Sequence, residues 1–136
     1  MTLPSINVLL NFTNELKSTA PPNPCYYKPS GSFQTLKFYD YGAQIAAWYD
    51  VYLSLKSAAR DAKKHGSEEV MGWRERQYGS ANVRLLLHPG PSMTWGMLME
   101  AIRGIAEFVT HYQFLDMDFD VVQTGLVMGT GILTVV

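Results

Sequence analysis

The chain has 136 residues and a formal net charge of −1, so it is long enough to fold as one domain around a buried core. Hydrophobic residues make up 47% of the sequence and charged residues 17%, a globular composition with fewer charges than usual. The near-neutral charge argues against nucleic acid as a partner. No apolar run approaches the roughly 18 residues needed to span a membrane.

The first 39 residues are predicted to form a helix over residues 5–18 and a proline-rich loop over residues 19–35. Apolar residues at helical spacing after Ser5 favour the helix, although a strand also fits part of the segment. Cys25 in the loop is the single cysteine, so no intramolecular disulfide is possible. One cysteine and the lack of a signal-peptide pattern favour an intracellular protein.

Residues 40–65 are predicted to form the longest helix, with Asp40 as its N-cap and Gly66 just after its end. Apolar side chains recur there at helical spacing, with most charged side chains off that stripe. Basic side chains gather at the end of this helix, where they complement the helix dipole. These are Arg60, Lys63, Lys64 and His65.

The rest of the chain alternates between hairpins and a second helix. Strands are predicted over residues 70–78 and 81–88, and a Pro-Gly-Pro turn ends the second of them. Ser92 or Thr94 then caps a helix that runs to about Tyr112. Strands over residues 115–122 and 126–135 follow, joined at Gln123-Thr124-Gly125.

The order from residue 40 onward is therefore helix, strand, strand, twice over. We expect a single two-layer α+β domain over residues 1–136, with two main helices on one face of an antiparallel sheet of at least four strands. Within it, residues 1–39 supply the N-terminal helix and loop, and residues 40–136 supply the two units. The apolar end of the last strand, residues 131–136, is predicted to be an unguarded edge that must be covered or paired with a partner chain.

Three aspartates alternate with apolar residues in the strand predicted over residues 115–122. Asp116, Asp118 and Asp120 therefore point to one side, with neighbours about 7 Å apart. Such a row can be the solvated face of a sheet, a binding surface or a metal site. A Ca²⁺ loop with this start needs Gly at its sixth position and Glu at its twelfth, and the chain has Val121 and Val127 there. The solvated face is favoured, and neither a metal nor a cofactor is predicted.

Aromatic residues supply the other binding candidates. Trp48, Tyr52, Trp73 and Trp95 can line an apolar ligand pocket, although an aromatic stripe at helical spacing usually packs in a core. His88 is a further candidate because it sits at a strand end, where loops often carry sites.

The C-terminal third contains its most distinctive short motifs, Met93-Thr94-Trp95-Gly96 and Gly129-Thr130-Gly131. With Ile102-Arg103-Gly104 between them, this block resembles the C-terminal block of small uncharacterised fungal proteins. The resemblance implies a possible fungal source and no activity.

No serine nucleophile motif, Cys–His pair or metal cluster is visible in the sequence, which favours a non-enzymatic role. We expect a binding or assembly module that self-associates or binds a protein partner through a sheet edge or apolar surface. The alternative is a small pocket enzyme or carrier for an apolar small molecule, which requires a closed cavity lined by the aromatic residues.

Overall fold

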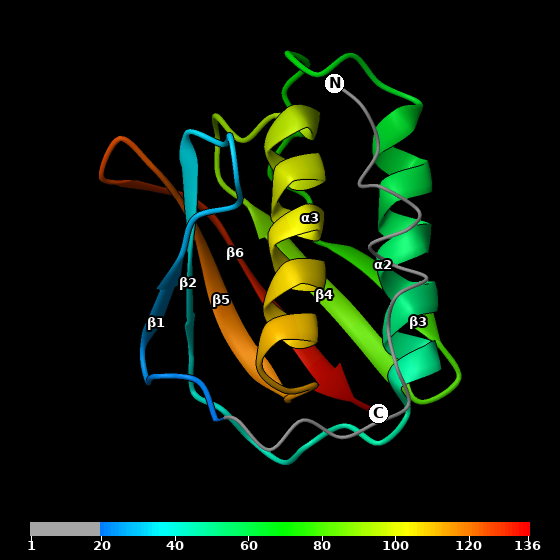
Figure 1. The fold of residues 1–136 in the computed structure, drawn as a ribbon. Coiled ribbons are helices and arrows are strands. Elements are labelled where there is room, and N and C mark those ends of the chain that lie inside the picture. The colour runs from blue at the N-terminus through cyan, green and yellow to red at the C-terminus, as the bar shows by residue number, and fades with distance from the viewer. Residues whose placement is uncertain (1–19) are drawn as a thin grey trace.

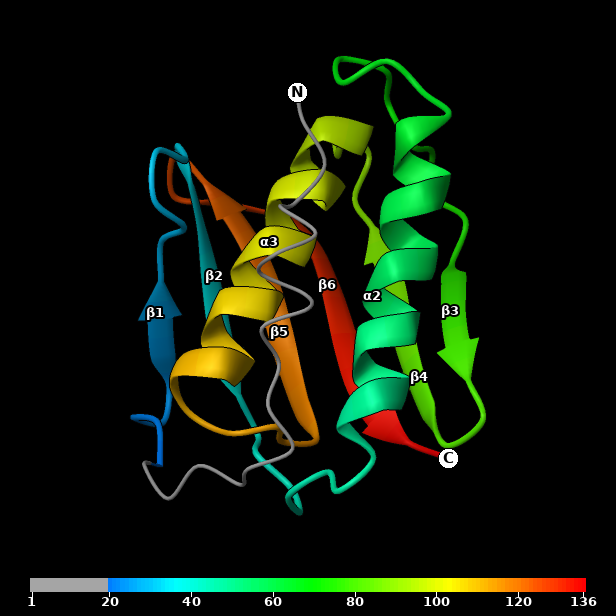
Figure 2. The same ribbon diagram turned by 45° about the vertical axis from the view of Figure 1, so that its right-hand side comes forward.

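The computed structural model describes residues 20–136 as a single α+β domain of two layers (Figure 1). One layer is a six-stranded sheet whose neighbouring strands all run antiparallel, in the order β1-β2-β5-β6-β4-β3. Helices α2 and α3 form the other layer, on one face of the sheet (Figure 2). The helix predicted over residues 5–18 lies outside the described residues. The elements are β1 (Cys25–Tyr27), β2 (Gln34–Tyr39), α2 (Trp48–Lys63), β3 (Arg76–Ser80), β4 (Val83–Pro89), α3 (Trp95–His111), β5 (Met117–Gln123) and β6 (Leu126–Val135).

The core lies between the sheet and the helices. Strand β5 shows how the sequence builds it, because Met117, Phe119 and Val121 are fully or almost fully buried while the aspartates between them are partly exposed. On the helix side, Phe108 of α3 stacks on Phe38 of β2 with ring centroids 4.0 Å apart. The alternation of β5 and the periodicity of α3 therefore meet in one hydrophobic core.

Several predicted features are confirmed. The helix-strand-strand order occurs twice, as α2-β3-β4 and α3-β5-β6. Thr94 is the N-cap of α3, since its Oγ1 accepts a hydrogen bond of 3.2 Å from the Met97 amide. Thr124 and Gly125 form the β5–β6 turn with positive φ angles of 51° and 77°, as tight hairpin turns require.

The predicted start of α2 at Asp40 is wrong, and the helix begins at Trp48. Residues 42–45 pair instead with the segment before β5: Gly42 and Ile45 donate backbone hydrogen bonds to Asp116 and Phe114. Asp40 itself has a φ of 52°, outside the range of a helical N-cap. Backbone groups that are already paired in this way cannot join the first turn of a helix.

The strand predicted from residue 70 is also wrong in its first half, because β3 begins at Arg76. Val70 and Met71 pair with the loop that leads into α3, and the Met71 amide donates to the carbonyl of Met93. Gly72 then turns the chain with a φ of 87°. The tertiary pairing with the α3 loop therefore replaces the pairing with β4 over these residues.

The proline-rich loop predicted over residues 19–35 contains a short strand. Cys25 in β1 pairs with Phe38 in β2, and β2 pairs with β5, which adds two strands beside β5. The position of the last strand is a further correction. β6 lies in the middle of the sheet, between β5 and β4, so residues 131–135 are paired within the chain and are not an open edge.

Candidate functional site

The predicted aromatic site residues do not gather around one cavity. Trp95 at the start of α3 is only 2% exposed. Tyr52 is also buried, and it lies near the start of α2, where Tyr49 contacts both Trp48 and Tyr52. Trp73 is 83% exposed in the loop before β3. Packing therefore accounts for the buried aromatic residues, and Trp73 belongs to a surface.

The three aspartates and His88 lie on the open face of the sheet, away from the helices. Asp116 accepts a hydrogen bond of 2.7 Å from Thr134, and Asp120 accepts one of 2.8 Å from the Tyr39 hydroxyl. His88 lies 3.4 Å from the carboxylate of Glu75. Within residues 20–136, no group of His, Cys, Asp and Glu has the arrangement of a metal site.

Asp118 is the aspartate with a perturbed environment. Burial raises the pKa of Asp118 above the usual 3.8, and its hydrogen bond to Asp40 and the charges of Asp40, Asp116 and Asp120 raise it further. The Asp118 carboxyl therefore binds a proton more tightly in the folded protein than in the unfolded chain. The contribution of this protonation to the stability of the fold is fully present below pH 3.8 and is lost as the pH rises through the pKa that Asp118 has in the folded protein.

This linkage predicts the effect of replacing Asp118 by Asn. The variant keeps a hydrogen-bonding side chain but carries no charge, so we expect a higher free energy of unfolding at pH 7 and no change near pH 3. Urea unfolding at the two pH values measures both. A gain of equal size at both pH values would show that packing, and not ionisation, is responsible.

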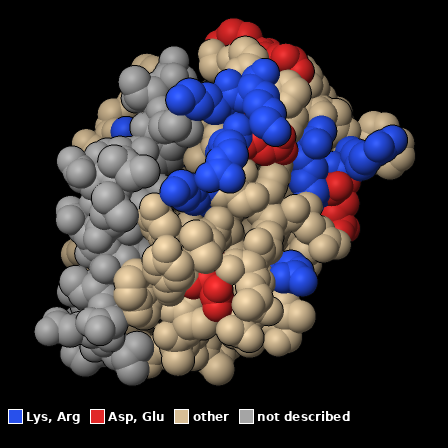
Figure 3. Space-filling view, turned by 90° about the vertical axis from the view of Figure 1, so that its right-hand side faces the viewer, with Lys and Arg blue, Asp and Glu red and all other residues tan. Residues whose placement is uncertain are grey.

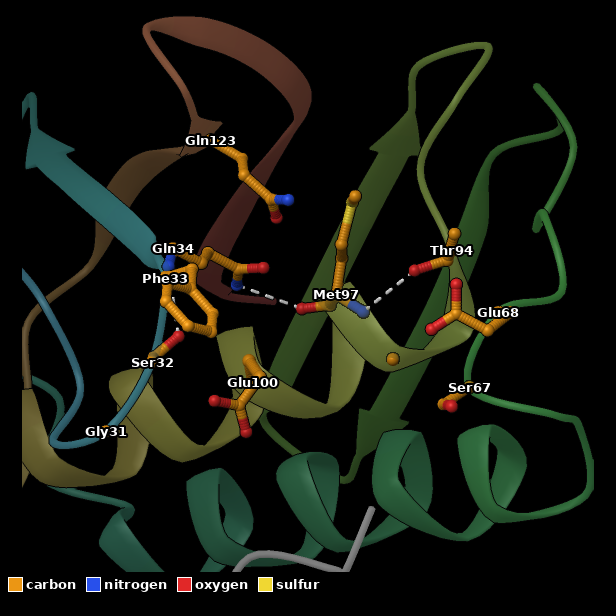
Figure 4. Close-up of a pocket in the computed structure, with 11 residues that line it drawn as sticks. Gly31, Ser32, Phe33, Gln34, Ser67, Glu68, Thr94, Met97, Glu100 and Gln123 are labelled. Carbon is orange, nitrogen blue, oxygen red and sulfur yellow. Dashed lines mark hydrogen bonds between the residues drawn. The ribbon is translucent and has the colours of Figure 1, made fainter.

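A pocket of about 300 Å³ opens at the end of the domain where α3 begins (Figure 4). Its walls come from the loop before β2, the loop after α2, the first turns of α3 and the end of β5. The lining residues are Gly31, Ser32, Phe33, Gln34, Ser67, Glu68, Thr94, Gly96, Met97, Glu100 and Gln123. None of the aromatic residues, aspartates or histidine predicted above as binding residues is among them.

Gln34 is the most buried polar side chain of the pocket wall, at 2% exposure. Its Nε2 donates a hydrogen bond of 3.0 Å to the carbonyl of Met97, which fixes the orientation of the amide. Among the described residues, its Oε1 has no hydrogen-bond partner. Figure 4 shows this oxygen pointing into the space below the Gln123 amide. This amide oxygen is open to the pocket, so it can accept a hydrogen bond from a ligand's donor.

The first turn of α3 leaves no free amides for an anion. Trp95 and Gly96 donate to the backbone carbonyls of Glu69 and Ser67, and Met97 donates to Thr94. Gly96 permits this contact, because a Cβ there would lie 2.7 Å from the Ser67 carbonyl oxygen. These amides are therefore paired within the protein, and the N-terminus of α3 does not offer them to a phosphate or carboxylate ligand.

Carboxylates give the pocket its charge. Glu100 and Glu68 line it, and no Lys, Arg or His side chain does. Arg103 lies behind Glu100 at 3.0 Å and donates a second hydrogen bond of 2.6 Å to the Ser30 carbonyl. Arg103 thereby ties the loop before β2 to α3, while Glu68 has no ion pair among the described residues.

Large apolar side chains are exposed on the segments that form this pocket or continue from its walls, and we call them the apolar rim: Phe33, Val70, Trp73, Leu126 and Val127. Phe33 lines the pocket and is 91% exposed. Leu126 pairs with Gln123 and Val70 pairs with Thr94. Both rim residues are therefore backbone neighbours of residues that line the pocket. Trp73 extends the rim along the loop that carries Val70. Solvent-exposed aromatic residues grouped at one end of a domain mark an interaction surface.

A stack of three side chains holds the wall formed by the loop after α2. The His65 ring lies parallel to the Trp95 indole with centroids 3.9 Å apart, and the Arg76 guanidinium lies 4.6 Å from the indole centroid. His65 also hydrogen bonds to Glu69 at 2.8 Å. Because Trp95 is fixed in the core, the stack positions the loop that carries Ser67 and Glu68.

A basic surface adjoins this loop. Figure 3, in which the side of the molecule bearing α2 and β3 faces the viewer, shows Lys and Arg side chains gathered over its upper half. The α2 side of this surface consists of Lys56, Arg60, Lys63 and Lys64, none of which forms an ion pair within the described residues. Lys63 and Lys64 lie at the end of α2, a few residues before Ser67 and Glu68.

Comparisons with known proteins identify no relative. No family model, no curated protein and no solved structure matches the chain, so the resemblance to fungal proteins stays a prediction. Among the described residues, no helix is long and apolar enough to cross a bilayer.

Proposed function

We propose that this domain is a non-enzymatic assembly module that self-associates through the apolar rim. The observation that carries the proposal is the position of the exposed aromatic and aliphatic side chains. Phe33 precedes β2 and lines the pocket at the start of α3, and Leu126 begins β6 opposite the pocket residue Gln123. Trp73 follows Val70, which pairs with the α3 cap Thr94, and it is 83% exposed. Burying them against a second copy removes apolar surface from water.

The apolar rim supports self-association better than a sheet edge does. The two edge strands of the described sheet are β1, with three residues, and β3, with five. Short edge strands offer few unpaired backbone groups and resist strand addition. β6, which the sequence suggested as the edge, is paired on both sides.

The pocket fits a binding role better than it fits the alternative function, a small enzyme or carrier that acts on an apolar molecule. The side chains that line it are mostly polar, whereas the alternative requires a closed cavity lined by Trp48, Tyr52 and Trp95. Glu100, its least exposed carboxylate, is already paired with Arg103 at 3.0 Å.

Sedimentation velocity over a concentration series tests the proposal. We expect a concentration-dependent monomer–dimer equilibrium in the wild type. The double variant Phe33→Ser/Trp73→Ser should weaken it at least tenfold, because both side chains are exposed in the monomer and are lost from the interface. Val136→Ser is the matched control, since Val136 is also exposed but lies at the opposite end of the domain.

Two outcomes would overturn the proposal. One is a wild-type protein that stays monomeric up to millimolar concentration. The other is a dimer that the rim variant and the control variant affect equally.

A further inference from the structure

We infer that the pocket receives a lysine side chain, supplied by Lys63 or Lys64 of a second copy of this chain. This inference rests on the proposed self-association and adds the chemistry of the contact. It identifies the pocket as the acceptor and the end of α2 as the donor in each copy.

The acceptors in the pocket match an ammonium group. The Oε1 of Gln34 has no partner among the described residues, and Glu68 and Glu100 line the same pocket. An ammonium group has three donors and no acceptor. A cation near Phe33 also gains from the face of an aromatic ring. An anion would meet two carboxylates and no free helix amide.

The arrangement of the two features suits a two-fold dimer. Lys63 and Lys64 end α2, and Ser67 and Glu68 of the next loop form a wall of the pocket. In a two-fold dimer, a contact between residue i of one copy and residue j of the other occurs twice. A basic surface beside an acidic pocket is therefore self-complementary: each copy gives a lysine and receives one.

Charge reversal separates this inference from the proposed function. We expect Lys63→Glu/Lys64→Glu and Glu68→Lys/Glu100→Lys each to weaken the homodimer at least tenfold, because like charges then face each other. An equimolar mixture of the two variants should form a heterodimer near wild-type affinity, since both contacts in it are complementary again. Lys37→Glu, on the open face of β2, is the control and should leave the dimer unchanged.

Glu68→Gln/Glu100→Gln serves as a milder pair if the reversed pocket does not fold, and we expect it to weaken the dimer several-fold. A wild-type dimer that is insensitive to both reversals overturns the inference and leaves the proposed function standing. A protein that remains monomeric overturns both.

A small probe tests the pocket without the dimer. In a Trp73→Ser/Leu126→Ser variant, which weakens the apolar rim and keeps every residue that lines the pocket, Nα-acetyl-lysine amide should shift the NMR signals of the Gln34 and Gln123 side-chain amides. The same compound with its ε-amine acetylated is neutral and should not. Equal shifts from both compounds, or none from either, would overturn the choice of a lysine.

Discussion

Replacing Trp95 by Ala is expected to lower the free energy of unfolding by about 3–5 kcal/mol, the range for removing a large buried aromatic side chain. Trp95 is 2% exposed, and its loss also removes the surface on which His65 and Arg76 stack. The loop that carries Ser67 and Glu68 then loses its support. The variant should therefore lose stability and a wall of the pocket together.

Urea unfolding followed by far-ultraviolet circular dichroism measures this change without relying on tryptophan fluorescence. Trp73→Ala is the matched control, because Trp73 is 83% exposed and its replacement should change the monomer's stability by no more than about 0.5 kcal/mol. Similar losses in the two variants would contradict the assignment of Trp95 to the core and Trp73 to the surface.

Replacing Gly131 by Ala is expected to destabilise the fold by about 1–3 kcal/mol, as overpacking of a filled core does. Gly131 pairs with Phe119 across the β5–β6 ladder, and the Phe119 ring lies over it. An added Cβ would overlap that ring and would lie 2.8 Å from the Leu86 carbonyl oxygen. Phe119 cannot withdraw easily, since it is buried near Phe38 with ring centroids 6.3 Å apart.

Gly66→Ala gives the comparison for Gly131→Ala under the same denaturation conditions. At Gly66, an added Cβ meets no atom within 4 Å, so this variant should be neutral or slightly stabilising through the unfolded state. If Gly131→Ala proved as stable as Gly66→Ala, the close contact between Phe119 and β6 would be refuted.

Sequence periodicity predicted the parts of the fold that local patterns specify. The spacing of Leu98, Ile102 and Ile105 marks α3, and Thr94 caps it. The alternation of β5 and the turn at Gly125 predicted the last hairpin. These features need no information from distant parts of the chain.

Other elements depend on contacts between distant segments. β2 carries its own alternation in Leu36 and Phe38, a local signal that is short and follows directly after a proline-rich segment. By contrast, no local sequence pattern places β6 between β5 and β4. Nor does a local pattern show that residues 70–71 pair with the loop before α3 and not with β4. Tertiary partners decide both, so the sequence pattern alone does not distinguish an apolar strand in the centre of the sheet from one at its edge.

The candidate site was the least predictable feature. Gln34 and Gln123 are far apart in the sequence and meet only because β2 pairs with β5. An isolated glutamine carries no signal of its own, so neither residue was a candidate. The aspartates of β5 attracted attention because they are regular, and regular alternation mainly reports one face of a strand.

NMR chemical shifts measured during dilution of the wild-type protein test most directly whether two copies associate through the apolar rim, at the end of the domain where α3 begins. The shifts that change with concentration should come from the apolar rim, namely Phe33, the Trp73 indole and Leu126, and from the Gln34 and Gln123 side-chain amides. Changes confined to the β1 or β3 edge, or to the aspartate face of the sheet, would contradict the account.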